Sequence, residues 1–193
     1  MKRLLSLLLA LSLLLSATLL LSACGTDDSG ASTEDTTDTS EDFEPLAGTA
    51  YDGIFYTINI PNGFERFQGS TYLNGTNGLT IDTVQMAATT TNEIPDELWV
   101  ADLNLTSVLA RYNTPTEKNY QIREFSTIKY LHERICEIHY ALYNTATKTT
   151  SYCTTIAIRS NPDEKGSFQY VNIHMMESDP NRPFAKSLSP TVK

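Results

Sequence analysis

The chain opens with a long apolar run. Residues 4–21 are almost wholly apolar, Lys2 and Arg3 precede them, and the small residues Ser22 and Ala23 follow. A basic start, an apolar core and a small-residue exit are typical of a secretory signal peptide. About 18 apolar residues would also just span a bilayer, so a retained membrane helix is the alternative.

After residue 48 the pattern of apolar and polar residues changes to the alternation that is typical of a β-strand. Apolar and polar positions alternate through Ile54, Tyr56, Ile58 and Ile60, and the turn residues Pro61-Asn62-Gly63 end this strand. Residues 79–86 form a second β-branched stretch. The Asn74-Gly75 pair before it predicts a hairpin turn.

A helical period follows in residues 95–112. Apolar residues recur there every three or four positions, at Leu98, Ala101, Leu105, Val108 and Tyr112. Pro95 suits the first turn, and the acids Asp96 and Glu97 suit the positive end of the helix dipole. We therefore predict the main helix here. Trp99 lies off the apolar stripe, and we interpret it as a packing residue rather than a ligand contact.

The C-terminal half predicts an antiparallel meander. Three segments rich in Thr, Tyr and Ile, residues 133–144, 147–160 and 166–177, read as strands joined by polar turns. Residues 128–142 also fit helical spacing, so a helix stays open there. Residues 184–193 predict a short helical turn and a tail. Together the elements predict an α+β fold with a single antiparallel sheet, one main helix and a short C-terminal helix.

Charge divides the chain into three parts. Eight acidic residues and no Lys or Arg lie within residues 25–46, a stretch otherwise rich in Ser and Thr. Such a segment buries too little apolar surface to fold, so we expect a disordered tether. We assign residues 1–23 to the signal peptide, 24–47 to the anchor and tether, and 48–193 to one globular domain. The excess of acidic residues argues against nucleic acid as a partner.

The residues that close the apolar run carry a motif. Leu21-Ser22-Ala23-Cys24 resembles the bacterial lipobox, in which the cysteine receives a diacylglycerol and becomes the new N-terminus. The resemblance implies lipid attachment at Cys24 and a domain held on the extracytoplasmic face of a bacterial membrane. Several acyl chains on one residue make such an anchor firm.

A second resemblance concerns the domain itself. The opening YTINIPNGF, the long helix, the meander and the closing PFAKSL are similar to the Mog1/PsbP-like fold, over about residues 52–190. This resemblance implies an antiparallel sheet with helices packed on it, and a role in binding or assembly. Phe64 stands near the place where the family often has a tryptophan.

Two cysteines remain after Cys24. If the hairpin is centred between Asn144 and Thr145, Cys136 and Cys153 face each other across the ladder. We therefore predict a disulfide, which would contribute roughly 3 kcal/mol by closing a loop of about 18 residues. Two buried free thiols are the alternative.

A metal site depends on the secondary structure of residues 128–142. On a helix, His132, Cys136 and His139 would share one face and suit zinc, whereas on a strand His139 points away. Because we favour the strand, we predict no metal and no other cofactor. His174 has no partner that the sequence reveals, and no nucleophile motif is present.

These observations favour a binding module over an enzyme. We expect a non-catalytic domain that binds an envelope protein or glycan through an aromatic surface around Phe64, Phe67 and Tyr72. The alternative is a small envelope hydrolase with an unrecognised or metal-dependent site.

Overall fold

The computed structural model of the chain describes residues 43–112 and 119–193. The expectations for residues 1–42, among them the signal peptide, the lipobox with Cys24 and most of the tether, lie outside the described residues. All the described residues belong to the unit Asp42–Lys193. Within them no helix is long and apolar enough to cross a membrane.

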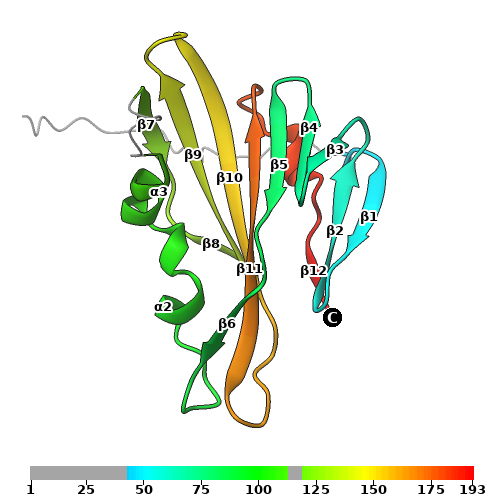
Figure 1. Cartoon of the computed structure of the whole chain (residues 1–193), viewed down its shortest axis with the longest axis vertical. Coiled ribbons are helices and arrows are strands. Elements are labelled where there is room, and N and C mark those ends of the chain that lie inside the picture. Colours follow the sequence, from blue (N-terminus) through cyan, green and yellow to red (C-terminus); the bar gives the residue numbers. More distant parts are fainter. Residues whose placement is uncertain (1–42, 113–118) are drawn as a thin grey trace, which may run out of the picture. The chain divides into compact units, whose positions relative to one another are not determined.

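Three long antiparallel strands form the centre of the larger sheet (Figure 1). They are β9 (Ile135–Asn144), β10 (Thr149–Arg159) and β11 (Ser167–Glu177), paired in the order β9, β10, β11. The predicted meander is therefore confirmed. The helical alternative for residues 128–142 is wrong, because this stretch contains β8 (Lys129–His132) and most of β9, which pair with each other.

Each outer strand of this meander has two partners in succession. One end of β11 pairs with β6 (Gln85–Ala88) and the other with β5 (Asn77–Ile81), which continues through the Asn74-Gly75 turn into β4 (Thr71–Asn74) and then β3 (Glu65–Gln68). In the same way, β9 pairs with β8 and with β7 (Tyr120–Phe125). The described part of this sheet thus has nine strands.

The prediction of a single sheet is wrong. A second, three-stranded antiparallel sheet joins β1 (Gly48–Asp52), β2 (Tyr56–Pro61) and β12 (Thr191–Val192). The alternation in β2 correctly indicates one buried face. It does not indicate the neighbours of the strand, which come from the two ends of the domain.

The prediction of one continuous main helix is also wrong. Residues 96–112 form α2 (Asp96–Trp99), a 3-10 turn (Ala101–Leu103) and α3 (Leu105–Tyr112). The break lies at Asn104, whose backbone is extended, with φ −106° and ψ 161°. Its side-chain oxygen accepts a hydrogen bond of 2.9 Å from the Ser107 amide, so Asn104 caps α3. The short C-terminal helix, α4 (Pro183–Lys186), forms as predicted.

A hydrophobic core covers each face of the larger sheet. Because strand side chains alternate, Cys136, Ile138 and Tyr140 of β9 point to the face covered by the helical segment, where Trp99 is buried at 1% exposure. On the other face, the side chains of β2 pack against those of β5, β10 and β11. Figure 1 shows α2 and α3 on one side of the long strands and β1, β2 and β12 on the other.

Candidate functional site

An aromatic pocket opens beside the turn that follows β2. It has a volume of about 320 Å³ and is lined by Tyr51 of β1, residues 61–64, and Tyr72 of β4, among others. Gly63 adopts φ +90° in this turn, a conformation that favours glycine. The turn therefore brings the smaller sheet and the β3–β4 hairpin to the walls of one pocket.

The rings that line this pocket are held by packing. Phe64 packs edge-on against Phe184 of α4, with ring centroids 5.1 Å apart and planes at 85°. The ring centroids of Tyr51 and Tyr56 are 6.2 Å apart, and Tyr72 packs against the hydrophobic core that contains Tyr56. Burial, with the neighbouring Tyr51 hydroxyl, raises the pKa of Tyr56, so this phenol stays neutral. The lining of the pocket therefore contains three packed aromatic rings and no charged residue.

The fold brings two of the three aromatic residues that were predicted to form a binding surface into one pocket. Phe64 and Tyr72 both line the pocket. Phe67 lies on β3, is 69% exposed, and is not a lining residue. Tyr51 was missed, because its strand is short and exposed and follows directly on the polar tether.

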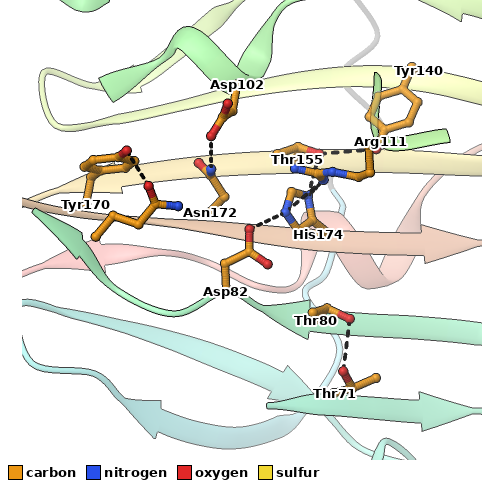
Figure 2. A network of polar contacts seen from close by, with 11 residues as sticks. Thr71, Thr80, Asp82, Asp102, Arg111, Tyr140, Thr155, Tyr170, Asn172 and His174 are labelled. Atoms are coloured by element: carbon orange, nitrogen blue, oxygen red, sulfur yellow. Dashed lines mark hydrogen bonds and ion pairs between the residues drawn. The ribbon is translucent and has the colours of Figure 1, made fainter. Parts of the chain in front are cut away.

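His174, which has no partner visible in the sequence, lies at the centre of a polar network (Figure 2). Its Nε2 lies 2.9 Å from Asp82 Oδ2, and its Nδ1 lies 3.0 Å from the Thr155 hydroxyl. Arg111 Nη1 lies 2.6 Å from Nδ1 and 2.9 Å from Nε2. The network thus links the segment after β5 to β10, β11 and α3.

The partners define the protonation state of this histidine. Burial lowers the pKa of His174, and the positive charge of Arg111 lowers it further, so the imidazole is neutral at neutral pH. Burial would raise the pKa of Asp82, but its hydrogen bond to His174 and the nearby Arg111 outweigh burial and lower it. We therefore assign the proton to Nε2, which donates to Asp82, while Nδ1 accepts.

A small second pocket, of about 250 Å³, opens onto this network. Its lining includes Asp82, Arg111 and His174, but not Thr155. The order carboxylate, imidazole, hydroxyl is the one that activates a nucleophile in hydrolases. Here the hydroxyl is buried, because Thr155 is 1% exposed and lies 3.4 Å from the Tyr140 hydroxyl. The pocket therefore presents the imidazole and the carboxylate to solvent without the hydroxyl.

The predicted disulfide is absent, because the hairpin register differs from the predicted one. Asn144 pairs with Thr149, so the turn is centred between Ala146 and Thr147, and Cys153 faces Tyr140. Cys136 lies four residues from Tyr140 along β9, which separates their Cα atoms by about 13 Å at the rise of a strand. A disulfide needs the two cysteine Cα atoms within about 7 Å of each other, so Cys136 cannot reach Cys153. Both cysteines are buried free thiols.

The three residues considered for zinc do not come together. Cys136 and His139 lie on β9 and point to opposite faces of the sheet, and His132 lies at the end of β8. His139 instead lies 3.4 Å from Glu137. Across residues 43–112 and 119–193, no group of three or more potential ligands is placed to hold a metal ion.

A scan against models of known protein families found no match, and no curated protein matches the sequence.

Proposed function

We propose that the chain is a lipoprotein, anchored through Cys24 to the extracytoplasmic face of a bacterial membrane, whose domain is a non-catalytic binding module. The anchor is supported by the lipobox-like Leu21-Ser22-Ala23-Cys24 after the apolar run. The acidic stretch of residues 25–46 would then act as a spacer. The partner that we propose is a glycan of the cell envelope.

The aromatic pocket is the observation that carries the binding proposal. Its volume of about 320 Å³ is within the range of small-ligand sites, about 300–1,000 Å³. Tyr51, Phe64 and Tyr72 supply aromatic surface, and Thr49 and Asn62 supply polar groups. A saccharide ring has apolar C–H faces that pack on aromatic rings, and hydroxyl groups that bond to polar side chains. This pocket offers both kinds of contact.

We also propose that the domain has a Mog1/PsbP-like fold. An antiparallel sheet with helical segments packed on one face supports this assignment. The closing α4, within the PFAKSL sequence, packs Phe184 against Phe64 and so contributes to the pocket wall. A binding role agrees with the role that this resemblance implies.

In-cell crosslinking and pull-down with the intact lipoprotein tests the proposal. Wild type should capture envelope glycan, and Tyr72→Ala should lose most of it because the variant removes one wall of the pocket. Phe67→Ala is the matched control, since this aromatic residue is on the adjacent strand but outside the pocket. Equal capture by Tyr72→Ala and wild type would overturn the proposal.

A second candidate function is hydrolysis, favoured by the Asp82–His174–Thr155 arrangement. We rank it lower because the hydroxyl is buried and does not line the adjacent pocket. Incubation of the purified chain with ester, peptide and glycan substrates separates the two functions. Turnover that His174→Gln abolishes would establish the hydrolase and overturn the non-catalytic proposal.

A further inference from the structure

A groove distinct from the aromatic pocket and from the His174 pocket lies between β8, β9 and α4. Two cavities, of about 320 and 350 Å³, share the lining residues Lys129, Glu137 and His139. None of these residues lines the aromatic pocket or the His174 pocket. The groove is therefore a separate feature of the domain.

The floor of the groove is apolar. Ile156 of β10 and Ala185 of α4, both buried, form part of its lining. Two apolar side chains at the rim, Phe43 and Leu131, are 41% and 43% exposed. A hydrophobic ligand in the groove would cover these side chains and remove their surface from water.

The rim also carries an excess of positive charge. Lys129, Arg182 and Lys186 line the cavity of about 320 Å³ together with a single carboxylate, that of Glu137. This local excess contrasts with residues 47–193 as a whole, which contain twelve basic and fifteen acidic residues. The groove is therefore a basic site on an otherwise acidic domain.

Glu137 does not neutralise all these cations. Its Oε1 lies 3.6 Å from Lys129 Nζ and 3.4 Å from His139 Nε2. Within the described residues, neither Arg182 nor Lys186 forms an ion pair. Neither cation is therefore held in a salt bridge in the described part of the chain, and Arg182 interacts only at longer range with the Glu177 carboxylate, whose ionised form its charge favours.

The guanidinium of Arg182 is held in place by uncharged groups. Its Nη2 donates to the Tyr140 carbonyl at 3.4 Å and its Nη1 to the Pro180 carbonyl at 3.3 Å. Its Cζ also lies 5.4 Å from the centroid of the Tyr152 ring. The Nε is buried and has no hydrogen-bond partner among the described residues. These contacts orient the side chain and leave its charge available to an anion.

We propose that this groove binds an amphiphile with an anionic head, that is, an alkyl carboxylate or an alkyl phosphate. The alkyl chain would lie on the floor of Ile156 and Ala185, and the head group would pair with Arg182 and Lys186. Free fatty acids and anionic membrane lipids share this chemistry. The inference is independent of the aromatic pocket, because it depends on different residues.

Isothermal titration calorimetry of the chain from residue 25 onward, which includes both hydrophobic cores, tests the proposal. The probes are decanoate, decyl phosphate and the uncharged decanol, each below its micelle-forming concentration. We expect both anions to bind at least about tenfold more tightly than decanol, and added salt to weaken only the anions. Vesicles of anionic and of zwitterionic phospholipid then distinguish a membrane lipid from a free amphiphile.

Two variants and a matched control make the test specific. The double variant Lys129→Glu, Lys186→Glu should weaken binding of decyl phosphate by at least about tenfold and leave decanol unchanged, whereas Leu131→Ser should weaken all three probes. Lys165→Glu changes the charge of an exposed turn away from the groove and should bind as wild type does. Decanol binding as tightly as the anions, or equal losses in Lys165→Glu and in the double variant, would overturn the proposal.

Discussion

In the native chain, Cys136 and Cys153 should stay free and resist alkylation until the domain unfolds. Burial raises the pKa of each thiol from 9.0 to about 12. The thiolate is the reactive species, so near pH 8 each buried thiol should hold about a thousandfold less of it than an exposed cysteine. Both side chains are also almost inaccessible to a reagent.

The assay is iodoacetamide labelling followed by mass spectrometry, on the chain from residue 25 onward so that Cys24 does not contribute. Native protein should gain almost no label over a period in which a small thiol reacts completely. In guanidinium without reductant, two labels should appear at once, one on each cysteine.

A tryptic peptide that joins Cys136 to Cys153 in protein never exposed to reductant would show that the two thiols are not free. That result would require the β9–β10 register to shift by four residues from the pairing of Cys153 with Tyr140. Rapid native labelling of either thiol would instead contradict its burial.

Four further predictions concern stability and the anchor. Burial lowers the pKa of His174, so the unfolded state binds a proton at this residue more readily than the folded state does. The free energy of unfolding should therefore fall as the pH drops below 6.5. In denaturant titrations, His174→Gln should remove this part of the pH dependence. Ile138→Ala empties a fully buried position and should cost about 2–5 kcal/mol in urea unfolding. Gly166 has φ +76°, and a Cβ there would collide with the Thr89 carbonyl, so thermal unfolding of Gly166→Ala should show a loss of more than about 1 kcal/mol. Mass spectrometry of the mature protein should find a lipidated Cys24 at the N-terminus, and Cys24→Ala should leave the membrane fraction.

Local signals in the sequence identify most of the strands. Alternation locates β2, the Thr- and Tyr-rich segments locate the long strands, and Asn74-Gly75 locates the hairpin between β4 and β5. Such signals extend over a few residues, so they identify an element but not its neighbour. The pairing of β12 with β2 joins the two ends of the domain and has no local signal.

The register between β9 and β10 is a second feature that the sequence does not predict. A hairpin centred between Asn144 and Thr145 would place the two cysteines opposite each other. The actual turn extends beyond this point because the Asn144 side-chain oxygen accepts hydrogen bonds from the amides of Ala146 and Thr147. A turn centred two residues farther along shifts the pairing by four residues and separates the thiols.

The candidate sites likewise contain some residues that local sequence signals identify and others that only the fold brings together. Phe64 and Tyr72 were predictable, since aromatic residues close to turns often line binding surfaces. The partners of His174 were not predictable, because Asp82 and Arg111 lie 92 and 63 residues away in the chain. The groove with Arg182 and Lys186 likewise forms only when α4 packs beside β8 and β9.

Glycan binding by the aromatic pocket can be measured in a residue-resolved NMR titration with soluble fragments of the cell-envelope glycan. We expect saturable chemical-shift changes confined to residues 49–51, 61–64 and Tyr72, and an intact ligand after prolonged incubation. The affinity should be at least about tenfold weaker in Tyr72→Ala and unchanged in Phe67→Ala. Shifts that avoid this pocket, or cleavage of the glycan by the purified chain, would contradict this expectation.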